Sequence, residues 1–273
     1  MTGETPRGGE AGPGTAPRET ERPVTAGRIL GLALPALGVL AAPPLYLLLD
    51  TAVVGRLGAI ELAALAAGAT VFSMLTAQLT FLAYGTTARA SRAFGRGDVR
   101  GAVSEGVQAT WVAVLVGMFL FVLVEVFART ITGWLTPEAA VADAAATWLR
   151  VVAAGIPLTL IAQAGNGWLR GVQDTRRPLL YVLAGLIPAA IAIVPLVQWL
   201  GLAGSAWSTV LGETITASLF ISRLVRTSGE LDVAARPRLT LIKRQLVPGR
   251  DPLLRPLAFQ VAFLSAAGVA GRL

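Results

Sequence analysis

Long uncharged stretches of apolar residues recur along the chain, and short arginine-containing segments separate them. A helix of about 20 apolar residues crosses the ~30 Å hydrocarbon core of a lipid bilayer. Stretches of this length, flanked by basic loops, predict membrane-spanning helices rather than a water-soluble core. The uncharged stretches are 29–49, 62–88, 106–124, 151–169 and 178–212.

The last of these stretches is too long for one spanning helix. It contains Gly201-Leu202-Ala203-Gly204, and glycine is common where helices end. We therefore expect two helices, near 179–200 and 206–226, which brings the number of complete spanning helices to six. A final apolar run, 256–271, is only 16 residues long and is interpreted as the start of a seventh helix, inside which the chain ends.

The composition narrows the fold class to an all-α membrane protein. The chain has 54% hydrophobic and 14% charged residues and a mean hydropathy of +0.66, whereas soluble domains carry about 25% charged residues. The net charge of +7 comes from loops between apolar runs rather than from one folded polar face. We therefore expect the lipid bilayer, and not nucleic acid, as the partner.

Several function classes lack the residues that they need. The sequence has no cysteine and no histidine, which removes disulfides and the commonest metal-site and nucleophile systems. The single lysine, Lys243, follows Ile242, so no Gly-Lys-Ser/Thr phosphate loop exists. We expect no enzyme activity, no cofactor and no metal site.

The distribution of basic residues predicts the orientation in the membrane. Nineteen arginines and lysines fall in the tail and in alternate loops, against three on the other side, Arg56, Arg129 and Arg150. Because basic loops stay in the cytoplasm, we expect a multi-pass plasma-membrane protein with a cytoplasmic N-terminus. In one of the basic loops, Asp174 is expected to pair with a neighbouring arginine or to cap the next helix.

The same pattern divides the chain into four parts. Residues 1–27 are rich in proline, glycine and charge and are expected to be a disordered cytoplasmic tail. Residues 28–226 form the six-helix transmembrane bundle, or lobe, and 227–252 a basic cytoplasmic linker. Residues 253–273 are interpreted as the truncated start of a second lobe.

Asp50 is the first candidate functional residue, because it directly follows the apolar stretch 29–49. An acid joined to a membrane-spanning segment is costly and is often functional. Burial favours the neutral form of a carboxyl group and a nearby cation favours the charged form, so such an acid can exchange a proton for a cation. The alternative is that Asp50 lies at the outer interface, since 21 helical residues span ~31 Å.

Other residues at membrane depth are weaker candidates. Glu213 is the second possible ion-binding acid, and prolines in the first helix, Pro35, Pro43 and Pro44, predict a bend or local unwinding. Polar and aromatic side chains could line an internal path for a small molecule, or could simply pack and hydrogen-bond between helices. These possible cavity-lining residues are Tyr46, Gln78, Tyr84, Gln163 and Asn166.

Four motifs give the chain a family resemblance over residues 27–273. In chain order they are DTAVVGRLG at 50–58 with Pro35 fifteen residues before it, YGTTA at 84–88 leading to FGRGD at 94–98, GNGWLRGVQDTRRP at 165–178, and GLAGSAW at 201–207. With these motifs the chain resembles the multidrug and toxic compound extrusion (MATE) transporters, in their DinF branch.

The resemblance implies a mechanism and a larger architecture. It implies two six-helix lobes that open alternately to each side and export amphipathic or cationic compounds in exchange for H⁺ or Na⁺. Asp50 matches the first-helix acid that family members protonate, and Pro35 the proline at which that helix bends. The resemblance also implies that this chain is the N-terminal lobe with the start of helix seven.

Two departures from the family pattern leave alternatives open. Some relatives place Asn and Asp in the fifth helix beside the acid, whereas 179–200 contains neither, and Pro43 stands where relatives often have Glu. Besides an efflux antiporter, the chain could be a non-transporting or vestigial half-transporter, or a lipid flippase of the same superfamily. The sequence decides neither the substrate, the coupling ion nor the oligomeric state.

Overall fold

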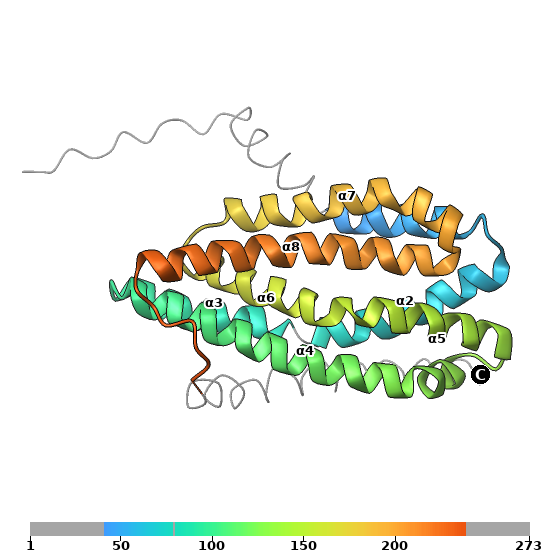
Figure 1. The fold of residues 1–273 in the computed structure, drawn as a ribbon, viewed down its shortest axis with the longest axis horizontal. Coiled ribbons are helices and arrows are strands. Elements are labelled where there is room, and N and C mark those ends of the chain that lie inside the picture. The colour runs from blue at the N-terminus through green and yellow to red at the C-terminus, as the bar shows by residue number, and fades with distance from the viewer. Residues whose placement is uncertain (1–40, 79, 239–273) are drawn as a thin grey trace, which may run out of the picture. The chain divides into compact units, whose positions relative to one another are not determined.

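The computed structural model describes residues 41–78 and 80–238, and its secondary structure there is helical. A first helix covers Ala41–Val54. Figure 1 shows the helices that follow it. They are α2 (Ala59–Gln78), α3 (Phe81–Gly95), α4 (Val99–Leu135), α5 (Ala139–Ala153), α6 (Gly155–Gly171), α7 (Arg176–Leu200) and α8 (Leu202–Glu230).

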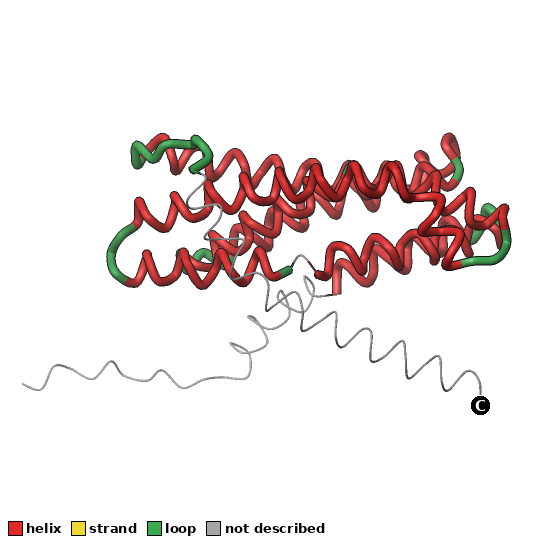
Figure 2. The backbone as a smooth tube through the Cα atoms, turned by 90° about the horizontal axis from the view of Figure 1, so that it is seen from below, coloured by secondary structure: helices red, strands yellow, loops and turns green. Residues whose placement is uncertain are grey.

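The helices pack side by side along a common direction, and the turns that join them lie mainly at the two ends of the bundle (Figure 2). The longest packing interfaces join α7 to α8 and α4 to α6. The pair α2–α3 runs beside the pair α5–α6, because α2 contacts α5 and α3 contacts α6. This arrangement places α6 in the middle, where it also contacts α8.

The outer surface of the described bundle is apolar, as expected for helices that face lipid. Large side chains such as Leu48, Phe119 and Ile191 are exposed, whereas soluble proteins rarely expose extended apolar patches. Three helices are long and apolar enough to cross a membrane, within α2, α4 and α7, and the bent pair α5–α6 makes a fourth if it counts as one span. The expected total of six spans stays a prediction, because the first helix is described only from Ala41 and α8 falls short of this apolarity.

Two local predictions are confirmed. The long stretch 178–212 divides at Gly201, which has φ +59° and separates α7 from α8. Its ψ of −140° combined with this φ gives a conformation that is essentially restricted to glycine. Asp174 both accepts a hydrogen bond from the backbone N–H of Arg177 (3.2 Å) and forms an ion pair with its guanidinium.

Two other predictions were wrong about helix continuity. The stretch 62–88 is not one helix, since α2 ends at Gln78 and α3 begins at Phe81; no glycine or proline stands at 79–80 to signal the break. The stretch 151–169 starts within α5, and the chain bends by 45° before α6. Pro157 explains this bend, because it cannot donate to the carbonyl of Ala153 and its ring crowds that group.

The Gly165-Asn166-Gly167 sequence brings three helices together. A Cβ atom on Gly165 would lie 2.6 Å from the ring of Phe220 on α8, and one on Gly167 would lie 2.4 Å from the carbonyl oxygen of Ala83 on α3. Both glycines therefore permit close helix packing, as small residues do in membrane bundles. Asn166, between them, is left to project into the cavity described below.

Some predicted features lie outside the described residues. These are the tail 1–27, Pro35, most of the linker 227–252 and the segment 253–273. The proposed division into tail, lobe, linker and second-lobe start therefore stays a prediction. Pro43 and Pro44 are described, and the helix Ala41–Val54 continues through them without unwinding.

Candidate binding site

A cavity of about 300 Å³ lies among the first helix, α6, α7 and α8. Its wall on the α7 side is apolar, with Val182, Leu186 and Ala189, and Pro43 contributes from the first helix. Hydroxyl, amide and carboxyl groups come from the other elements. These polar lining residues are Tyr46, Thr159, Gln163, Asn166, Thr209, Glu213 and Thr216.

Glu213 is the one lining residue of this cavity that carries a formal charge. It lies partly buried on α8, near the side chain of Thr159 on α6. The Thr159 hydroxyl carries no charge, so it does not neutralise the carboxylate of Glu213. The cavity therefore combines apolar walls with one negative group, which suits an organic cation that has apolar bulk.

The α6 side of the cavity supplies two amides. Gln163 and Asn166 are three residues apart, so they share one face of the helix. The Oδ1 atom of Asn166 is buried and has no hydrogen-bond partner among the described residues. An unsatisfied buried acceptor is unfavourable by roughly 1–3 kcal/mol, so a donor from water or from a bound molecule would stabilise it.

Asp50 lies beside this cavity rather than in its lining. It is only 4% exposed, and it lies near the side chain of Ser205 on α8. Its Oδ1 atom has no partner in the described part of the chain. The interface alternative raised by the sequence, in which Asp50 simply meets water, does not fit this burial.

A hydroxyl network connects Asp50 to the cavity. Tyr46, one helical turn before Asp50, has its hydroxyl 2.7 Å from Oγ of Ser208 and 3.2 Å from Oγ1 of Thr209. On the other side, the indole N–H of Trp148 donates to Oγ of Ser205 at 3.2 Å. Tyr46 also lines the cavity together with Glu213, so its side chain lies near both acids.

Several of these partners were missed in the sequence interpretation. The missed residues are Trp148, Thr159, Ser205, Ser208 and Thr209. A signal was available on α8, where Ser205, Thr209 and Thr216 recur at spacings that place them on one helical face. Serine and threonine are common in membrane helices, which is why this stripe did not stand out.

The structure brings together only some of the predicted cavity residues. Tyr46, Gln163 and Asn166 line the cavity with Glu213. Tyr84 is 68% exposed and lies outside it, because it is on α3 and faces away from the described bundle. Gln78 closes α2, but its side chain lies outside the described residues.

The described residues contain no cluster of three or more His, Cys, Asp or Glu side chains that could hold a metal ion. The side chain of Ser205 lies near Asp50. The segment 179–200 adds no Asn or Asp.

Comparison with known proteins places this geometry in a family context. The MatE family model matches residues 35–196, more than half of the chain. The chain is 30% identical to DNA damage-inducible protein F of Escherichia coli (strain K12) over 252 residues, covering 89% of this chain and 54% of that protein. It is 29% identical to Protein DETOXIFICATION 44, chloroplastic, of Arabidopsis thaliana, covering 72% and 40% of the two chains.

Solved structures show the same fold. A MOP superfamily transporter from Pyrococcus furiosus aligns with a TM-score of 0.76 at 24% identity, over 86% of this chain and 54% of the other. A multidrug resistance MATE family transporter in an outward-facing conformation gives the same values. The chain thus spans about half the length of the relatives that it matches.

Proposed function

The chain belongs to the MatE family, and we propose that its helical bundle is one half of a secondary active transporter. The transporter exports amphipathic or cationic compounds in exchange for H⁺ or Na⁺, without a cofactor. Its partners are the small-molecule substrate and the lipid bilayer of the plasma membrane. The names of the relatives, which include a multidrug resistance transporter and a DETOXIFICATION protein, support this substrate class.

The proposal rests on the presence of two acids at different positions, one in the cavity lining and one buried beside it. Glu213 faces a partly apolar cavity, where it can attract the charge of an organic cation. Asp50 is buried next to that cavity with an unpartnered Oδ1 atom, where it can hold a proton. Both acids lie near Tyr46, which lines the cavity with Glu213 and precedes Asp50 by one helical turn, and a change of charge at one acid alters the electrostatic energy of the other.

The small set of oxygen ligands beside Asp50 favours a proton as the coupling ion over Na⁺. Hard cations prefer several carboxylate, carbonyl or water oxygens, and the described partner of Asp50 is one serine hydroxyl. A lipid flippase is not favoured, because the cavity lining has no positive side chain to hold a phosphate headgroup.

Binding of a fluorescent organic cation, such as ethidium, to the purified chain tests the proposal. We expect saturable binding that weakens when the buffer is acidified, since a proton on an acid removes the charge that attracts the cation. Binding linkage is reciprocal, so ethidium must also release protons, which an unbuffered titration measures. Efflux from vesicles under an imposed pH gradient then tests whether the chain alone completes a pathway. An ethidium affinity that changes neither with pH nor with Na⁺ concentration would contradict the proposed antiport.

The proposed orientation gives a separate prediction. Because the chain has no natural cysteine, one introduced cysteine is a unique label site, either at Ala139, the exposed first residue of α5, or at Gly97, in an exposed turn. With the N-terminus in the cytoplasm, a membrane-impermeant thiol reagent should label Ala139→Cys in intact cells, and Gly97→Cys only after lysis. Labelling of Gly97→Cys in intact cells would instead indicate the opposite topology.

A further inference from the structure

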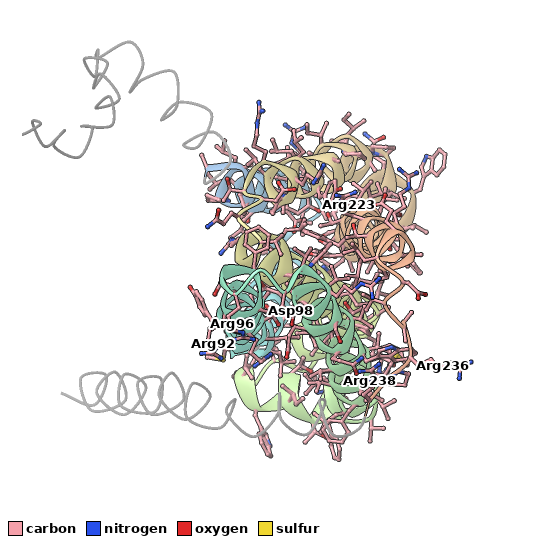
Figure 3. The ribbon with its side chains drawn as sticks, turned by 90° about the vertical axis from the view of Figure 1, so that its left-hand side faces the viewer. Arg92, Arg96, Asp98, Arg223, Arg236 and Arg238 are labelled. Carbon is pink, nitrogen blue, oxygen red and sulfur yellow. The ribbon has the colours of Figure 1, made fainter. Side chains whose placement is uncertain are left out.

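A second cavity, of about 170 Å³, lies at the arginine-rich end of the bundle, where α3 ends and α4 begins. Its lining is almost entirely charged. Figure 3 shows Arg92, Arg96 and Asp98 on the same side of this end, apart from Arg236 and Arg238. The lining residues that matter here are Arg89, Arg92, Arg96, Asp98, Gly101 and Glu105.

Three of the charged residues at this cavity have structural partners. The Nε atom of Arg89 lies 3.1 Å from Oε2 of Glu105, and these side chains are only 11% and 18% exposed. Asp98 accepts a hydrogen bond from the backbone N–H of Gly101 at 2.7 Å and so caps α4. The largely buried ion pair between Arg89 and Glu105 joins α3 to α4 at this cavity.

Arg92 and Arg96 have no such partner. Neither forms an ion pair with a carboxylate among the described residues. They are four residues apart on α3, so they lie on one face of the helix, and both are exposed at the cavity. The cavity therefore presents two guanidinium groups whose charge the protein does not satisfy.

The cavity lies at the depth of lipid headgroups. In α4, residues 106–124 are uncharged, and 19 helical residues span ~28 Å, close to the thickness of the hydrocarbon core. Glu105 directly precedes this uncharged stretch, so it is expected at the boundary between the hydrocarbon core and the headgroups. The cavity that Glu105 lines is expected at the same depth. An exposed apolar surface on α4, including Phe119 and Val122, continues from there along the same helix.

We propose that this cavity binds the phosphate group of an anionic phospholipid. Arginine donates in a planar fork that matches phosphate oxygens, and basic pockets between membrane helices bind anionic headgroups. Arg92 and Arg96 contact the phosphate, while Arg89 and Glu105 hold the two helices in place beneath it. The site is separate from the cavity of Glu213 and does not depend on the proposed transport function.

The test titrates the purified chain with phosphatidylglycerol and with phosphatidylcholine of the same acyl chains, and counts bound lipid by native mass spectrometry. Phosphatidylglycerol should bind about tenfold more tightly, and R92Q/R96Q should reduce its binding to that of phosphatidylcholine. The control R176Q/R226Q removes the same charge from exposed positions at the same end of the bundle and should retain the preference.

Three results would overturn the proposal. They are unchanged lipid preference in R92Q/R96Q, equal loss in the control variant, and displacement of the lipid by an equimolar amount of inorganic phosphate. The last would identify a site for a free anion instead. If R92Q/R96Q does not fold, R96Q alone carries the test, because Arg96 is an exposed residue at the end of α3. R92K/R96K keeps the charge but loses the fork, and should bind with intermediate affinity.

Discussion

Asp50→Asn should insert and fold normally but lose ion-coupled transport, with gradient-driven ethidium efflux reduced by at least about tenfold. Asparagine keeps the size of aspartate and can still hydrogen-bond to Ser205, but it cannot bind and release a proton. The substitution also removes a buried carboxyl group with an unpartnered oxygen, so the folded state should not be destabilised. The measurement compares efflux from loaded vesicles under an imposed pH or Na⁺ gradient.

Ethidium binding gives a second readout for Asp50→Asn on the same chain. Because Asp50 does not line the cavity, affinity at neutral pH should change by only a few-fold, while the part of the response to acidification that comes from Asp50 should disappear. Asp143→Asn is the matched control, since Asp143 is exposed and pairs with Arg129 near the protein surface, where an ion pair contributes little. If ethidium efflux by Asp50→Asn still followed the imposed ion gradient in full, Asp50 would not be the proton-binding acid.

The main features of the fold could be predicted because they depend on local composition. Apolar stretches of membrane length and the glycine at 201 are enough to predict α7 and α8. The break between α2 and α3 could not be predicted, since Gln78, Leu79 and Thr80 are ordinary helix residues. The two helices pack on different partners, α2 on α5 and α3 on α6, and the sequence of one helix does not report such contacts.

The candidate site could likewise be predicted only in part from the sequence. Asp50 and Glu213 could be identified from sequence because a carboxyl group in an apolar segment is rare. Their different positions, one lining the cavity and one buried beside it, depend on how the first helix is rotated against α8. Tyr84 illustrates the limit, because an aromatic residue at membrane depth can face a cavity or the outside, and in the described bundle Tyr84 is exposed and lies apart from the cavity of Glu213.

Glu213→Gln should instead impair recognition of the cation itself. Glu213 is the one charged lining residue of the cavity, and glutamine has the same shape and can still bond to Thr159. Ethidium affinity should fall about tenfold, equivalent to ~1.4 kcal/mol, whereas a neutral compound of similar size should bind as before. Competition binding to the purified variant, with a cationic and a neutral ligand in parallel, measures this ratio.

Glu125→Gln is the control for Glu213→Gln, because Glu125 is also in a membrane-spanning helix but does not line the cavity. It should leave the ratio of cationic to neutral affinity unchanged. The two acids then have separable signatures. Glu213→Gln lowers cation affinity at those pH values where Glu213 is charged and keeps the part of the pH response that comes from Asp50, while Asp50→Asn keeps affinity and loses coupling. If Glu213→Gln alone abolished coupling and Asp50→Asn did not, the proton-binding acid would be Glu213 on α8, and the first helix would have no direct part in ion exchange.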